Sequence, residues 1–368
     1  MNKQGETPTY PVTADYIISL GNDFEEVFAT SGIKGCVVAK GTDAAMVIQE
    51  AINALPTEGG HIYISSGSYQ LNSTITIEDK HGVHLHGVAR GIVFSGGKEG
   101  TVLRSDRDID LIEVFGNALK VAGITVSNLH LVGSGKKNGK AGILVHGTSD
   151  LLSLHNVGVN HCGVGFHLRG GGGKGGGVVD APQIQFCDPQ LNGVGLKIER
   201  GHYAKVMGGE FSDCEEFGIF LSSPENGYAR NQGIKIIGVT GVRNSRAGIV
   251  IGRNTEDATV AGGCDFAGAH SGSGIVISDE GSGEKPRNVI ISGIHVYNNR
   301  DAGILVESAS HVVIQGCICS GHDHVVVDDP GQQHGINIKD EVLNIVVNGN
   351  VTYGNRAEPI LDETERAV

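Results

Sequence analysis

Short apolar runs that begin at a glycine recur along most of this chain. In each run a Gly is followed by a β-branched, aromatic or aliphatic residue and then by alternating positions that are mostly apolar. The copies begin at Gly142, Gly165, Gly195, Gly218, Gly248, Gly274 and Gly303. Their spacing of roughly 23 to 30 residues is typical of solenoid proteins, in which each repeat forms one coil.

Further β-rich runs lie between these copies, for example at Gly233–Ile237, Asn288–Ile291 and His311–Ile314. Each unit therefore holds two or three strands of about 3 to 5 residues, separated by Gly, Asn, Asp and Ser turns. A helix is disfavoured because Gly and β-branched residues are poor in helix interiors. We predict an all-β solenoid in which strands of successive coils lie about 4.8 Å apart. Turn glycines and asparagines would supply positive φ.

The N-terminal segment follows a different pattern. Apolar residues at helical spacing predict a helix over 43–55, capped by Thr42 or Asp43, which would cover the open end of the first coil. Residues 15–19 and 36–39 predict a small hairpin attached to that cap. The expected organisation is an N-terminal extension and hairpin at 1–41, the solenoid at 42–350 and a C-terminal tail at 351–368.

Composition narrows the classes of protein. The chain has 58 Gly but only 9 Pro, and its formal net charge is −13. The charge argues against nucleic acid as a partner, and the lack of about 18 consecutive apolar residues argues against membrane insertion. Residues 1–12 show no secretory signal. Seven Cys is an odd number and too low a density for a disulfide scaffold, so buried, reduced thiols are expected. Cys317 and Cys319 have no second pair of metal ligands nearby, which argues against a metal site there.

Several N-terminal motifs carry a resemblance to a known family. They are Gly41–Ala45, Ile48–Ala54, Gly59–Ile64, Gly67–Leu71 and Gly82–Gly87. Together these motifs resemble the opening of proteins in the pectate-lyase-like superfamily. The resemblance implies a right-handed parallel β-helix that extends to about residue 350. It also implies a function among polysaccharide lyases, polygalacturonases, epimerases and virus tailspikes, so it is specific for the fold and not for the reaction.

Polar residues just before the repeated Gly strands form the main candidate site. Alignment on the Gly places Glu216, Arg246, His270, Arg300 with Asp301, and His322 with Asp323 and His324 at equivalent places in successive coils. Such side chains should stack along one edge of the solenoid. The simpler interpretation is that Asp213, Asn244 and Asn299 are turn residues that make local backbone hydrogen bonds.

Two reactions suit these residue types. Glycoside hydrolysis needs an acid and an ionised carboxyl group, and Asp301 and Asp323 on adjacent coils would lie about 5 Å apart, as retaining hydrolases require. Arg246 or Arg300 would bind a uronate or sulfate group, and His322 and His324 would carry protons. We therefore expect catalytic roles for Glu216, Arg246, Asp301, Asp323 and His324, and substrate binding by His270, Arg300 and His322.

A lyase is the second enzymatic interpretation. No cofactor is otherwise expected, but Asp213, Glu215 and Glu216 could bind Ca²⁺ that acidifies a uronate, while Arg246 accepts its proton. A polygalacturonase is disfavoured, because Asp328 and Asp329 lack the surrounding motifs and His334 follows Gln333 instead of Gly.

The expected function is therefore a protein that binds and cleaves a polysaccharide or cell-surface glycan. The alternative is a non-catalytic, glycan- or receptor-binding fibre, such as a virion spike or a cell-surface scaffold. A homotrimer would fit the spike. Three observations favour this alternative: the chain has no Trp, no complete catalytic motif and no visible signal peptide. Either function fits an extracellular or virion-surface location. The run from Gly170 to Gly177 is expected to be a turn insertion instead of a phosphate-binding loop.

Overall fold

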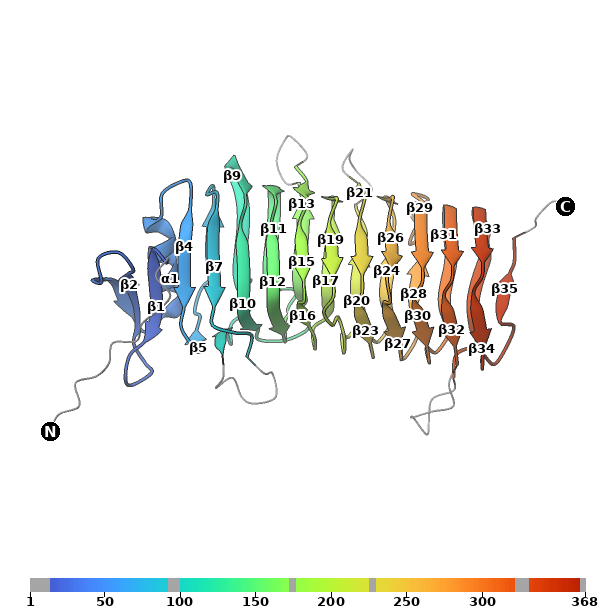
Figure 1. Cartoon of the computed structure of the whole chain (residues 1–368), viewed down its shortest axis with the longest axis horizontal. Coiled ribbons are helices and arrows are strands. Elements are labelled where there is room, and N and C mark those ends of the chain that lie inside the picture. The colour runs from blue at the N-terminus through green and yellow to red at the C-terminus, as the bar shows by residue number, and fades with distance from the viewer. Residues whose placement is uncertain (1–13, 92–99, 172–176, 225–229, 322–330, 365–368) are drawn as a thin grey trace.

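The computed structural model describes residues 14–91, 100–171, 177–224, 230–321 and 331–364. In these ranges the chain forms an elongated stack of coils, with the N-terminal elements at one end and β35 at the other (Figure 1). The glycine-rich residues 172–176 of the expected turn insertion lie outside the described ranges.

Three rows of strands run along the stack, each strand pairing in parallel with its counterpart in the next coil. The first row consists of β6 (Ile75–Glu78), β9 (Ile112–Ala122), β11 (Ala141–Asp150), β13 (Val164–Gly170), β17 (Val194–Glu199), β20 (Phe217–Leu221), β24 (Ala247–Ile251), β28 (Ile275–Ile277), β31 (Ala302–Gln315), β33 (His334–Asn348) and β35 (Ile360–Asp362). β9, β11, β31 and β33 continue beyond this row around the next turn.

The second and third rows complete each coil. The second row comprises β4 (Gly60–Ile64), β7 (Val83–Gly87), β10 (Thr125–Val132), β12 (Ser153–Asn160), β15 (Gln183–Gln185), β19 (Lys205–Met207), β22 (Lys235–Ile237), β26 (Thr259–Ala261) and β29 (Arg287–Ser292). The third comprises β5 (Gly67–Gln70), β8 (Thr101–Arg104), β16 (Asp188–Pro189), β23 (Thr240–Val242), β27 (Asp265–Ala267), β30 (His295–Tyr297), β32 (Ile318–Ser320) and β34 (Val351–Tyr353). Short strands at the turn between the first two rows are β14 (Val179–Asp180), β18 (Gly201–His202), β21 (Asn231–Gln232) and β25 (Thr255–Glu256).

The predicted all-β solenoid is therefore confirmed. Ile, Val and Leu from all three rows point inward and form one continuous core, and Phe166, Phe211 and Phe266 are among its largest fully buried side chains. The end of the stack extends further than the sequence suggested. β34 pairs with β32 and β35 pairs with β33, although both strands lie in the segment that was expected to be a tail.

The N-terminal cap is also present. Helix α1 spans Ala44–Ala54, and the side chain of Asp43 accepts a hydrogen bond from the backbone N–H of Ala45. Its apolar face is buried between the N-terminal strands and the first coil, where it removes core side chains from water. The expected hairpin is wrong in its pairing. β2 (Val27–Ser31) lies between β1 (Tyr16–Leu20) and β3 (Val37–Gly41), and the three strands form an antiparallel sheet.

The glycines that start the first-row strands are needed because neighbouring coils pack closely there, and not because the backbone has a positive φ. A Cβ atom on Gly218 would lie 2.6 Å from the carbonyl oxygen of Gly248, and one on Gly248 would lie 2.9 Å from that of Gly274. Neither glycine has a positive φ, so the requirement is for space between neighbouring coils. Turn glycines such as Gly238 and Gly293 do have positive φ, as the sequence predicted.

Six of the seven cysteines are buried as free thiols, and Cys36 is exposed. Burial raises the pKa of Cys162, Cys187 and Cys214 to about 12, so these thiols behave as small apolar core residues. The structure thus agrees with the expected burial for all but Cys36. No helix among the described residues is long and apolar enough to cross a membrane.

Candidate functional site

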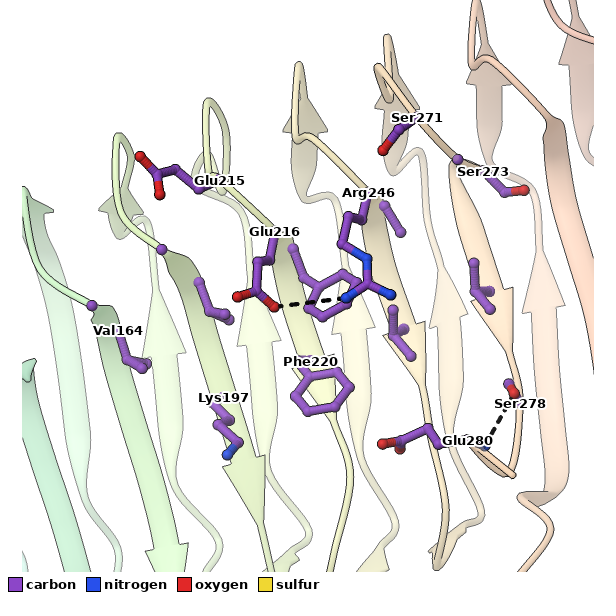
Figure 2. Close-up of a pocket in the computed structure, with 18 of the residues that line it drawn as sticks. Val164, Lys197, Glu215, Glu216, Phe220, Arg246, Ser271, Ser273, Ser278 and Glu280 are labelled. Carbon is purple, nitrogen blue, oxygen red and sulfur yellow. Dashed lines mark hydrogen bonds and ion pairs between the residues drawn. The ribbon is translucent and has the colours of Figure 1, made fainter. Parts of the chain in front are cut away.

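A groove with a volume of about 1020 Å³ runs over the outer face of the first row. It crosses β13, β17, β20, β24, β28 and β31, and the loop residues Lys136 and Lys137 line one part of it. Figure 2 shows side chains from several successive coils pointing into this groove. A groove that follows the stacking direction suits a long, linear ligand, because each coil offers the next part of the ligand an equivalent position.

In-register positions of neighbouring strands form the floor of the groove. Lys197 pairs with Phe220, Phe220 with Val250, and Val250 with Val276. These side chains face outward because the residues on either side of each point into the core. Leu305 continues the same line of positions on β31.

Phe217 and Phe220 give the floor an aromatic platform. Their ring centroids are 5.0 Å apart and the ring planes differ by 16°, so the two rings are stacked. Both side chains are partly exposed and line the groove. The chain has no Trp, and this phenylalanine pair supplies the flat apolar surface on which a sugar ring can pack.

Charged groups surround the aromatic platform. The guanidinium carbon of Arg246 lies 5.0 Å from the centre of the Phe217 ring, and the Lys197 ammonium lies 5.9 Å from the centre of the Phe220 ring. The carboxylate of Glu216 is 4.0 Å from the Arg246 guanidinium, and the two side chains point toward each other in Figure 2. More than half of each side chain is exposed, so solvent weakens this ion pair and leaves both groups accessible to a ligand.

The structure places Glu216, Arg246 and Asp301 in one column at the edge of the groove, as the sequence predicted. The Arg246 N–H donates to the Glu216 carbonyl, and the Asp301 N–H donates to the carbonyl of Gly272 in the coil after Arg246. Glu216 and Asp301 are therefore three coil steps apart, or about 14 Å. This separation exceeds the roughly 9.5 Å upper limit for the carboxyl pair of an inverting hydrolase.

Asp301 has a neutral partner, since the hydroxyl of Ser273 donates to its carboxylate at 3.1 Å. The residue expected to pair with it, Asp323, lies outside the described residues, as do His322 and His324. The predicted Asp301–Asp323 pair and the proton-carrying roles of these histidines therefore remain predictions.

The remaining predicted residues lie beside the groove. His270 lines a shallower hollow of about 530 Å³, which shares Lys136 and Glu215 with the groove. Arg300 is exposed at the edge of its coil and does not line either hollow. Their predicted substrate-binding roles remain predictions.

Two of the three acidic residues proposed for Ca²⁺ face arginine side chains. Asp213 accepts two hydrogen bonds from Arg243, at 2.8 and 2.7 Å, while Glu216 faces Arg246. The ion pair with Asp213 raises the pKa of Arg243. Among the residues that the structure describes, no three His, Cys, Asp or Glu side chains form a cluster suited to a metal ion.

The buried asparagines of the candidate column are structural. Asn244 accepts a hydrogen bond from the N–H of Cys214 and donates to the carbonyl of Phe211, both in the preceding coil. Asn299 makes the equivalent bonds to Ala269 and Phe266. The simpler interpretation of these residues was correct in assigning them to the turns, but their hydrogen bonds join neighbouring coils and are not local.

Lys197, Phe217 and Phe220 are among the groove residues that the sequence interpretation missed. The alternation within the repeated strands contained the necessary information, because Lys197 stands between buried Leu196 and Ile198 and must face outward. The candidate column predicted from the sequence consists of turn residues that precede the first-row strands, whereas the middle of the groove lies on the strands themselves.

Comparison with known proteins identifies the fold. A family described as "Right handed beta helix region" matches residues 225–361. The A-module of mannuronan C-5 epimerase AlgE6 from Azotobacter vinelandii is similar in structure, with a TM-score of 0.58 and 13% sequence identity, over 88% of this chain and 96% of that module. The chain is a right-handed parallel β-helix. The expected resemblance to the pectate-lyase-like superfamily is thereby confirmed at the level of the fold.

Other β-helix proteins are similar over most of this chain. The Dettilon tailspike protein matches 87% of the chain with a TM-score of 0.57 and 14% identity, and the chain spans 65% of that protein. The catalytic domain of Agl-KA matches 87% of the chain, with a TM-score of 0.54, 14% identity and 66% of that domain covered. No curated protein sequence matches the chain. At these identities the structural likeness establishes the fold, so function must be argued from the groove.

Proposed function

We propose that this β-helix binds an acidic polysaccharide along the groove and cleaves it by elimination. The stacked Phe217 and Phe220 rings, with Lys197 and Arg246 over them, carry this proposal. The rings offer apolar faces to sugar rings, while the two cations offer charge-assisted hydrogen bonds to carboxylate groups. Several solved structures with the same fold are alginate or mannuronan epimerases by title, which supports a uronate-containing ligand.

Elimination fits the described groove better than hydrolysis. Of the carboxylates expected to be catalytic, the structure describes Glu216 and Asp301, and their three-coil separation is too large for the two to act on one glycosidic bond. Elimination needs a cation to stabilise the uronate carboxylate as the adjacent C–H bond loses its proton, together with a base. Arg246 and Lys197 are placed to meet the first requirement.

A non-catalytic binding module is the second candidate. It is favoured by the absence of His and Tyr among the described residues that line the groove, because these side chains are common proton acceptors. In this alternative the aromatic platform and the cations hold the glycan without reaction.

Incubation with neutral, uronate-containing and sulfated polysaccharides separates the two candidates. Elimination produces new reducing ends together with ultraviolet absorbance from the unsaturated product, and only uronate-containing chains should give both. Glycan retention without either change would establish the binding module. Reducing ends without absorbance would indicate hydrolysis and refute elimination.

The groove itself is tested with a matched pair of phenylalanine variants. Phe220→Ala removes half of the aromatic platform and should weaken glycan binding roughly 2- to 10-fold. Phe186→Ala removes a phenylalanine that is 59% exposed and does not line the groove, so binding should not change. Equal effects of the two variants would show that the glycan does not bind on Phe220.

A further inference from the structure

A histidine–glutamate pair lies on the outer face of the first row beside the N-terminal end of the groove. His167 Nε2 is 2.7 Å from a carboxylate oxygen of Glu199, and 16% and 20% of the two side chains are exposed. The other carboxylate oxygen of Glu199 is 3.1 Å from the Lys197 ammonium. Lys197 therefore links this pair to the aromatic platform.

Strand register places His167 on the line of the groove floor. His167 pairs with Lys197 across β13 and β17, and Lys197 pairs with Phe220 across β17 and β20. All three side chains face outward at equivalent positions. A glycan can pack one sugar on Phe220 and run along the stack toward the N-terminal end. It then passes over Lys197 and next over His167.

The pairing also fixes the chemical state of Glu199. The hydrogen bond from His167 and the charge of Lys197 outweigh the effect of burial and lower the pKa of Glu199 to about 2. An ionised carboxylate only accepts hydrogen bonds, so Nε2 of His167 must carry the proton of that bond. Nδ1 of a neutral ring is then left as the basic atom, in the arrangement that a carboxylate imposes on a catalytic histidine.

We propose that His167 is the base for the elimination and that Glu199 is its positioning residue, an inference that rests on the proposed function. His167 Nδ1 accepts the proton from C5 of a uronate residue bound over β13 and β17. The electrons of the C5–H bond form the C4=C5 double bond as the bond from C4 to the leaving sugar oxygen breaks. That oxygen takes a proton from solvent, and Lys197 stabilises the charge that develops on the uronate carboxylate.

A neighbouring pair provides a matched control. His146 Nε2 is 2.8 Å from Glu113, so it makes the same kind of contact one coil closer to the N-terminus. His146 is in register with Arg169 and Glu199 instead of with Lys197 and Phe220, so it lies off the line of the groove floor. His146→Ala removes an equivalent contact and should leave cleavage unchanged.

The test measures the cleavage rate and the binding of a uronate polysaccharide to the full chain. His167→Ala and His167→Gln should each lower kcat by about 10²- to 10⁴-fold and change binding less than about twofold. Added imidazole should restore part of the rate to His167→Ala, whereas a purely structural defect would not respond. Glu199→Gln should lower kcat by about 10- to 100-fold with little change in KM, and Glu199→Asp should retain more of the rate.

The possible outcomes separate the two proposals. If the parent protein cleaves the polysaccharide and both His167 variants cleave it at a rate within threefold of the parent, the role of His167 is overturned. The proposed function would then remain intact. An equal loss in His146→Ala, or no rescue by imidazole, also overturns it. A parent protein that cleaves no uronate polysaccharide overturns the proposed function and this inference with it.

Discussion

The buried histidine His130 should make the stability of the β-helix depend on pH. Its side chain lies on β10 and is only 3% exposed, with the positive charges of Arg90 and His161 nearby. Burial is the main cause that lowers the pKa of His130 to about 4, from its ordinary value of 6.5. The folded protein therefore binds this proton less readily than the unfolded chain does.

The direction of the effect follows from that difference. Well above pH 6.5 the ring is neutral in both states and this difference in pKa has no effect on stability. As the pH falls below 6.5 the unfolded chain gains a proton first, so the free energy of unfolding decreases. The loss is about 2 kcal/mol at pH 5 and approaches about 3 kcal/mol near pH 4.

The assay is urea unfolding followed by far-ultraviolet circular dichroism, because the chain has no Trp to report by fluorescence. His130→Gln should be less stable than the parent at about pH 7.5 but should lose about 2 kcal/mol less between about pH 7.5 and pH 5. His84 and His86, whose pKa values are also lowered by burial, act equally in both proteins.

His155→Gln is the matched control, since His155 is an exposed histidine on β12, the strand that pairs with β10. It should lose as much stability on acidification as the parent. The reasoning about His130 is refuted if His130→Gln and the parent lose the same free energy over this pH range.

Four further variants test other parts of the molecule. Gly248→Ala should destabilise the fold by about 1–3 kcal/mol in urea unfolding, because the new Cβ meets Phe266 at 2.6 Å. At Gly263 the space is open but φ is +74°, so Gly263→Ala should destabilise the fold by backbone strain and without a clash. Asn244→Ala should cost about 1–3 kcal/mol by thermal or urea unfolding, since the buried N–H of Cys214 loses its acceptor. Asp301→Asn should leave elimination within about threefold of the parent in the cleavage assay, and a greater loss would restore Asp301 to a catalytic role.

The sequence alone determined the architecture, because the Gly-led strands repeat at the length of one coil and their alternation separates core from surface. It also determined the cap, since Asp43 and the apolar spacing of the following residues are local properties of one helix. The column that contains Glu216, Arg246 and Asp301 was found in the same way, by aligning the repeats.

Only the tertiary structure decided which residues act together. Coils of unequal length set the strand register, and the register brings Phe220, Lys197 and His167 onto one line although they are more than 20 residues apart in sequence. It likewise separates Glu216 from Asp301 by three coils, so these two carboxylates do not form the acid and base of one hydrolytic site. Residue type gives each side chain its chemistry, while the stacking of the coils fixes the distances between them.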